Sequence, residues 1–195
     1  MQAIGLRIKS GFAIAAIVKR SADGFAIEAV RKILLSSEDL PQSRFPYHPT
    51  IELPERQGAV LSEKAVKEVR RTAAQEMRKV LAEFDGIKRA GMVVGSVIDP
   101  DSLGNPHVRV HALEGKLFRE VVAEVLRKND IGCGVLLERD AYARAAADMT
   151  SAEPQLRAQV AALGQPHIKP WRAEEKLATL AALWSLVPGE KNSGN

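Results

Sequence analysis

Two histidines and a glutamate are spaced so that they could bind a transition metal. His107 and His111 are four residues apart near the start of a predicted helix, and Glu114 follows three residues later. Residues three and four apart lie on one side of a helix, and imidazole and carboxylate groups are ligands for zinc and related metals. Asp99 and Asp101 precede the same helix and could add oxygen ligands. Because this spacing is common in helices, the sequence permits a metal site here without requiring one.

The remaining histidines and the single cysteine carry weaker signals. His48 and His167 lie in proline-containing loops, and we expect them to be surface or capping residues. Cys133 lies in an apolar stretch typical of a strand, so we interpret it as a small buried residue and not as a nucleophile. One thiol cannot form an internal disulfide, which favours a reducing compartment. The sequence contains no Walker-type phosphate loop, no dinucleotide fingerprint and no serine nucleophile elbow.

The composition is that of an ordinary globular chain. Of its 195 residues, 46% are hydrophobic and 27% are charged, which excludes a disordered or collagen-like protein. Lys and Arg number 28 against 24 Asp and Glu. The resulting net charge of +4 permits an anionic partner without requiring one.

The apolar segments of the sequence do not predict a membrane protein. No apolar run is long enough to cross a bilayer, so we expect no membrane partner. A short apolar block at residues 12–18 resembles an export signal, but Lys19 and Arg20 occupy the place of a small-residue cleavage site. We interpret the block as a strand and expect a cytoplasmic location.

The N-terminal part of the chain predicts three strands, at residues 3–9, 12–19 and 25–35. Apolar and other residues alternate in the first of them, so that Arg7 and Lys9 share one face. Glycine-containing turns join the strands, and strands joined by such short turns pair antiparallel.

Residues 36–58 form a proline-rich excursion with no sustained periodicity. Residues 44–49, Arg-Phe-Pro-Tyr-His-Pro, lie at its centre. Long excursions in compact domains are often functional. The alternative is a rigid connector whose aromatic side chains pack on the body of the protein.

The rest of the chain predicts alternating helices and strands. Ser62 could cap a helix that runs to residue 84, and Asn105 with Pro106 marks a second helix start. Apolar runs predict buried strands at 91–98 and 130–139, and further helices are expected at 154–163 and 172–186. This order predicts an α/β fold whose mixed sheet has three antiparallel strands followed by parallel strands, with helices on both faces. We expect a single domain of residues 1–188 and a polar tail of residues 189–195.

This layout resembles the ribonuclease H-like fold and, within it, the RuvC branch of Holliday-junction resolvases. In that family the first strand reads Gly-Ile-Asp-x-Gly, and residues 5–11 here read Gly-Leu-Arg-Ile-Lys-Ser-Gly. The family's fourth strand ends in an acid, which Val97-Ile98-Asp99 matches. Its last helix carries Asp-Ala-Ala-Asp-Ala-Leu-Ala, which is similar to Arg-Ala-Glu-Glu-Lys-Leu-Ala at residues 172–178.

The resemblance implies a nuclease that holds two divalent cations with carboxylates from the sheet and the last helix. Asp99 and Glu175 keep an acid at two matched positions, whereas Arg7 and Arg172 replace the acid at two others. Each arginine removes a ligand and adds a cation that repels metal ions. The resemblance therefore implies a degenerate site, with Asp99, Glu174 and Glu175 as catalytic candidates and Asp99, Asp101 and Glu175 as candidate metal ligands.

The basic residues of this region allow two interpretations. Arg7, Lys9 and Arg172 could together bind a phosphate or a carboxylate. Alternatively, Arg7 could form a structural ion pair with Asp99 or with a glutamate, inside a former active site.

Three functions remain open. The leading hypothesis is a resolvase-related protein with an eroded metal centre and no cofactor, which binds nucleic acid or another polyanion or acts as an interaction subunit. The alternative is an active Mg²⁺- or Mn²⁺-dependent nuclease, with ligands drawn from Asp99, Asp101, Glu138, Glu174 and Glu175. The third is a homodimer built through the Trp184 helix or the proline-rich excursion.

Overall fold

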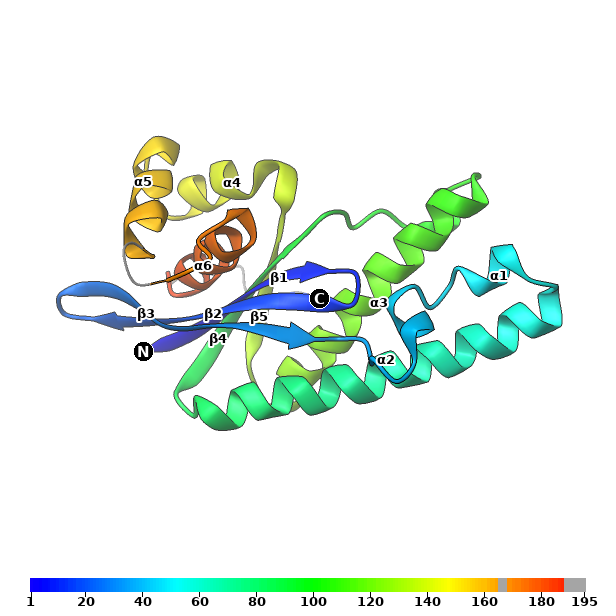
Figure 1. The fold of residues 1–195 in the computed structure, drawn as a ribbon. Helices are drawn as coiled ribbons and strands as arrows, with labels where there is room; N and C mark the ends of the chain where they lie inside the picture. Colours follow the sequence, from blue (N-terminus) through cyan, green and yellow to red (C-terminus); the bar gives the residue numbers. More distant parts are fainter. Residues whose placement is uncertain (165–167, 188–195) are drawn as a thin grey trace.

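A five-stranded mixed sheet forms the centre of the protein (Figure 1). The computed structural model describes residues 1–164 and 168–187. The strands are β1 (Gln2–Lys9), β2 (Phe12–Ser21), β3 (Gly24–Leu34), β4 (Ile87–Val94) and β5 (Gly132–Leu137), in the order β3-β2-β1-β4-β5. The first three are antiparallel, and β4 and β5 continue the sheet parallel to β1. The predicted mixed sheet is therefore confirmed.

Tight turns that contain glycine connect the three antiparallel strands. Gly11 and Gly24, at the two hairpin turns, have φ angles of 82° and 119°. Glycine adopts positive φ angles without steric cost. The short glycine turns from which the three antiparallel strands were predicted are therefore present in the structure.

Two long helices cover one face of the sheet: α2 (Glu55–Glu83) and α3 (Pro106–Lys128). Ile4, Leu6 and Ile8 of β1 share a core with the apolar stripes of both helices. Because Ile4, Leu6 and Ile8 are spaced two residues apart on the strand, all three side chains point to this face. Asn105 caps α3 through its side-chain oxygen, which accepts from the N–H groups of His107 and Val108 at 3.0 and 3.2 Å.

Three further helices cover the opposite face: α4 (Ala141–Asp148), α5 (Glu153–Leu163) and α6 (Ala173–Ser185). α6 lies directly on the sheet, because a Cβ atom at Gly5 would come within 1.8 Å of the Ala178 carbonyl oxygen. The helices on both faces confirm the predicted architecture. No described helix combines the length and apolar character needed to cross a membrane.

Short elements complete the described chain. The proline-rich excursion contains η1 (Pro41–Arg44) and α1 (Pro49–Glu52), and α1 packs against α2. η2 (Pro100–Ser102) precedes α3, and η3 (Glu138–Asp140) follows β5. The predicted polar tail and His167 lie outside the described residues.

Two local predictions are corrected, and one short helix was missed. The helix that Ser62 was expected to cap begins earlier, at Glu55. Ser62 lies within this helix, and its side chain is buried. β4 ends at Val94, where its partner β5 also ends at Leu137, so the chain beyond cannot continue the ladder as far as residue 98. The short helix α4 was not predicted.

Candidate functional site

A pocket opens where β1, β4 and β5 end. Arg7, Lys9, Val94 and Glu138 line it from the sheet side, and α3 lines it from the other side with residues that include His111. The strands β1, β4 and β5 run parallel, so their carboxyl ends meet at one edge of the sheet. Such edges are where open α/β sheets place their binding sites.

Arg7 forms an ion pair with Glu138 in this pocket. Its side chain is 2% exposed, and its Nη2 group donates to the Glu138 carboxylate. Its Nη1 group donates to the carbonyl oxygens of Ile8 at 3.0 Å and Val93 at 3.3 Å. An arginine cannot lose its charge at ordinary pH, so Glu138 is what neutralises it. The sequence prediction that Arg7 pairs with Asp99 or a glutamate is met by Glu138.

The charges lining the pocket are mostly positive. Among the described residues that line it, Arg7 and Lys9 are cations and Glu138 is the one acid. Arg119 adds a cation close by, because its Nη1 group donates to the carbonyl oxygen of Ser96, a lining residue. The arrangement suits an anion better than a set of metal cations.

Asp99 and Asp101 lie outside this pocket. Because β4 ends at Val94, Asp99 does not end a strand, and the register that placed it beside β1 is wrong. Its Oδ1 atom accepts from the Asp101 N–H group at 3.2 Å, and the Asp101 carboxylate pairs with Arg109. Both aspartates are exposed, Asp99 just before η2 and Asp101 within it.

The candidate residues of α6 also lie elsewhere. Glu175 is buried, and its Oε2 atom accepts from the Arg172 N–H group at 2.8 Å, which caps the helix. It lines a hollow over β2 and β3 instead of the pocket of Arg7. Arg172 is exposed and Glu174 is half-buried, and neither lines that pocket. The structure therefore brings Arg7 and Lys9 into one pocket, without Arg172, Asp99 or Glu175.

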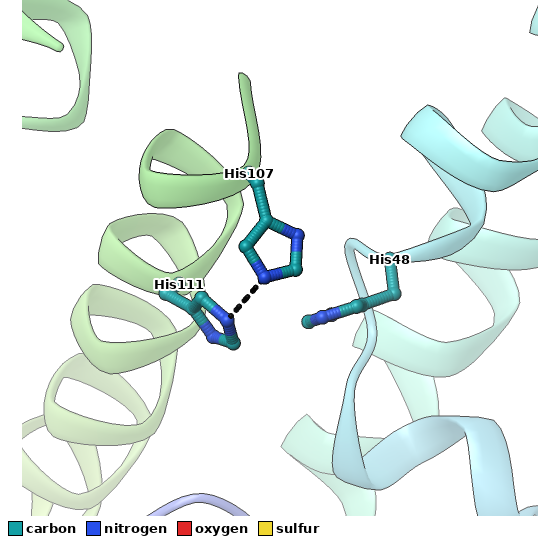
Figure 2. Close-up of side chains that lie close together, drawn as sticks. All are labelled: His48, His107 and His111. Atoms are coloured by element: carbon teal, nitrogen blue, oxygen red, sulfur yellow. Dashed lines mark hydrogen bonds between the residues drawn. The ribbon is translucent and has the colours of Figure 1, made fainter. Parts of the chain in front are cut away.

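A cluster of three histidines lies beside the pocket (Figure 2). His107 and His111 come from α3, and His48 reaches them from the excursion. The Nε2 atoms of His107 and His111 are 3.1 Å apart, and one ligand nitrogen from each histidine lies within 4.8 Å of the others. The expected one-sided arrangement of His107 and His111 is confirmed.

His48 departs from its prediction as a surface or capping residue. It precedes α1, but its side chain makes no capping hydrogen bond. Its Nδ1 atom instead lies 2.8 Å from Oε1 of Glu114, whose side chain is 1% exposed. No signal in the sequence linked His48 to α3, because the two segments are far apart along the chain. The three histidines offer ligands for a cation. The expectation that the protein has no cofactor is therefore not confirmed.

The fold of the chain is similar to that of a solved Holliday-junction resolvase. No protein-family model matches the chain, and a search of curated proteins found no match. Among solved structures, RuvC from Thermus thermophilus superposes with a TM-score of 0.57 at 11% identity, over 94% of this chain and 92% of that one. The chain has a ribonuclease H-like fold. The expected ribonuclease H-like architecture is thereby confirmed at the level of the fold.

Two further ribonuclease H-like structures resemble the chain. Thermus thermophilus RuvC in complex with a Holliday junction substrate has a TM-score of 0.57 at 10% identity and covers 94% of this chain and 91% of its own. The yeast mitochondrial Holliday junction resolvase Ydc2 has a TM-score of 0.46 at 9% identity, over 94% and 75% of the two chains.

Proposed function

We propose that this ribonuclease H-like protein binds nucleic acid through the pocket at the ends of β1 and β4, and that it lacks a two-metal centre. The observation that carries the proposal is the buried Arg7, paired with Glu138, at the carboxyl end of β1. A guanidinium about 5 Å from a dication would be repelled by roughly 6 kcal/mol at an effective dielectric constant near 20. The single lining acid is already engaged with Arg7, so these residues do not fit two divalent cations.

The same charges favour a phosphate backbone. Lys9 is half-buried at the pocket, and Arg119 is held beside it by the carbonyl of Ser96. Lysine and arginine contacts to phosphates supply most of the sequence-independent affinity for nucleic acid. A Holliday junction substrate is bound by one of the structures with this fold, which makes branched DNA the first ligand to test.

The alternative remains an active nuclease dependent on Mg²⁺ or Mn²⁺. Glu138 favours it most, because its side chain is 46% exposed and one oxygen could turn toward a cation at the pocket. Asp99 and Asp101 could contribute only if the loop before α3 moved toward the pocket.

Binding and cleavage measured on the same substrates test the proposal. Fluorescence anisotropy with a labelled four-way junction, a duplex and a single strand should give saturable binding without added metal. Incubation with Mg²⁺ or Mn²⁺ should leave the strands intact, and Asp99→Ala should bind as the wild type does. Metal-dependent cutting that is lost in Glu138→Gln would overturn the proposal in favour of the nuclease.

A homodimer built through the Trp184 helix or the proline-rich excursion is the remaining alternative. Trp184 is half-buried, and its Nε1 group donates to Oδ2 of Asp148 in the same chain at 3.0 Å. The excursion packs against α2 through α1 and contacts α3 through His48. Phe45 and Ile51 of the excursion are each 40% exposed, so a dimer could use these side chains or the exposed part of Trp184, and light scattering at several concentrations would detect it.

A further inference from the structure

We propose that His48, His107 and His111 form a binding site for a transition-metal dication, of which Zn²⁺ fits best. Figure 2 shows the three imidazole rings turned toward one another across the space between α3 and the excursion. The ring centroids lie 4.7 to 5.6 Å apart. The three rings meet edge to face, and the Nε2 atoms of His107 and His111 face each other.

The distances match a tetrahedral zinc site. Histidine nitrogens bind zinc at about 2.0–2.1 Å, so two ligands of a tetrahedral ion lie about 3.3 Å apart. The Nε2 atoms of His107 and His111 are 3.1 Å apart, and the complete set of ligand nitrogens lies within 4.8 Å. The three nitrogens would have to close from at most 4.8 Å to about 3.3 Å around a bound tetrahedral ion.

Glu114 orients the ring of His48 and lies beside the ring of His111. Its Oε1 atom lies 2.8 Å from Nδ1 of His48, and its Oε2 atom lies 3.6 Å from Nδ1 of His111. In both rings the Nδ1 atom faces the carboxylate, which leaves Nε2 for a metal. Metal-binding histidines commonly hold a carboxylate in this way, and the carboxylate fixes both the tautomer and the ring orientation. Glu114 is therefore a positioning residue and not a ligand.

The charge of Glu114 points to a cation as well. Its side chain is 1% exposed, and Oε2 has no hydrogen-bond partner. Its other oxygen accepts from the Tyr47 N–H group at 3.3 Å in addition to facing His48. A buried carboxylate with an unpaired oxygen is costly unless a positive charge lies near it. A dication held by the three rings would supply that charge.

The chemistry of the ligands selects the class of metal. Three imidazole nitrogens suit zinc, copper, nickel and cobalt, whereas magnesium and calcium prefer oxygen ligands. His107 and His111 are both exposed, so solvent can reach the fourth position of a tetrahedral ion. Three protein ligands with an open fourth position is the pattern of sites that bind a water or a small ligand. His111 also lines the pocket of Arg7 and Lys9, so the metal would add positive charge at its rim.

The proline-rich excursion acquires a role in this proposal. It carries His48 to α3, and the buried Ser43 braces it by accepting from the Ser37 N–H group at 2.9 Å and donating to the Leu40 carbonyl at 2.6 Å. The metal would thus tie two segments that are distant in the sequence.

Metal titration of the full chain, expressed without a histidine tag and stripped with chelator, tests the proposal. Competition with a chromogenic chelator should show one equivalent of Zn²⁺ bound, and Co²⁺ should give the intense visible absorption of tetrahedral nitrogen ligation. His107→Ala and His111→Ala, both at exposed positions, and His48→Ala should each weaken binding at least tenfold. Arg109→Gln, between the two α3 histidines but paired with Asp101, is the matched control and should bind as the wild type does.

Glu114→Gln separates positioning from ligation. It should keep one-site stoichiometry but lower the affinity for Zn²⁺ by about 10–100-fold, and should alter the Co²⁺ spectrum. Circular dichroism of each metal-free variant establishes that it is folded. Stoichiometric binding that survives in the folded double variant His107→Ala/His111→Ala, or no binding by the wild type at micromolar Zn²⁺, would overturn the proposal. Nucleic-acid binding measured in chelator is independent of this result, because the proposed phosphate contacts are Lys9 and Arg119.

Discussion

Arg7 and Glu138 differ in exposure, and this difference decides which of them the protein can lose. Arg7 is 2% exposed and Glu138 is 46% exposed. Glu138→Gln leaves a buried guanidinium without a counter-charge, and we expect a loss of about 1–3 kcal/mol in the free energy of unfolding. Arg7→Met leaves a carboxylate that water can reach, so its cost should stay within about 1 kcal/mol.

Urea unfolding of both variants measures these costs. Glu120→Gln, which removes an exposed acid paired with Lys116 on α3, is the control and should change stability by less than about 0.5 kcal/mol. Equal losses in Arg7→Met and Glu138→Gln would contradict the argument from burial.

Cys133 was predicted to be a small buried residue, and in the structure it is half-buried and packs against the core. Burial raises the pKa of its thiol to about 12, because the charged thiolate would lose its hydration. The thiol should therefore react with a disulfide reagent at pH 8 at least ten times more slowly in the folded protein than in urea. Equal rates in both conditions would contradict the interpretation of Cys133 as a structural residue and not a nucleophile.

At the scale of elements, two glycines of the sheet allow the backbone of α6 to lie directly against it. A Cβ atom at Gly5 would lie 1.8 Å from the Ala178 carbonyl oxygen, and one at Gly91 would lie 2.4 Å from that of Ala181. Since backbone atoms of α6 cannot rotate away, Gly5→Ala must push the helix off the sheet. We expect it to cost more than about 3 kcal/mol, at the upper end of single substitutions.

Gly115→Ala is the matched control for this prediction. A Cβ atom there meets no atom within 4 Å, and Gly115 lies inside α3. Alanine favours the helix over glycine by up to about 1 kcal/mol. Thermal unfolding should therefore show opposite shifts for Gly5→Ala and Gly115→Ala, and a small loss at Gly5 would contradict the close approach of α6.

The surface of α2 carries a pH-dependent contribution to stability. The hydrogen bond from Arg71 lowers the pKa of the Glu68 carboxyl to about 2, although partial burial by itself would raise that pKa. Since the folded pKa lies below the unfolded one, the contribution is present above about pH 4.5 and is lost as the pH falls toward 2. Arg71 is 59% exposed, so screening by water should keep the loss near 1 kcal/mol.

Unfolding of Glu68→Gln between pH 7 and pH 3 checks this contribution. The variant should lose less stability over that interval than the wild type does. Parallel curves for the two proteins would contradict it.

At the scale of the whole molecule, the proposed anion pocket predicts how nucleic-acid binding depends on salt. Each phosphate contact that is neutralised releases counterions, so the logarithm of the affinity falls linearly with the logarithm of the salt concentration. Lys9→Gln should reduce that slope by about 1. Lys79→Gln, at an exposed cation of α2 paired with Glu76, removes the same charge and should leave the slope unchanged. Equal effects of the two variants would indicate nonspecific attraction to the net charge.

The architecture was predictable because it depends on local patterns. Alternation in β1, the glycine turns and the apolar stripe of α3 each depend on residues that are near one another in sequence. The end of β4 was not predictable, because Val97 and Ile98 have the apolar character of a strand but no neighbouring strand to pair with. They are 51% and 56% exposed on the loop instead.

The sequence by itself determined most of the elements, the mixed sheet and the position of Arg7 on the first strand. Only the tertiary structure decided that Arg7 meets Glu138, that His48 joins His107 and His111, and that Asp99 lies apart from Glu175. Periodicity reports which face of its own element a side chain occupies. Which distant side chain it meets depends on strand register and on the path of loops such as the excursion, which no local pattern encodes.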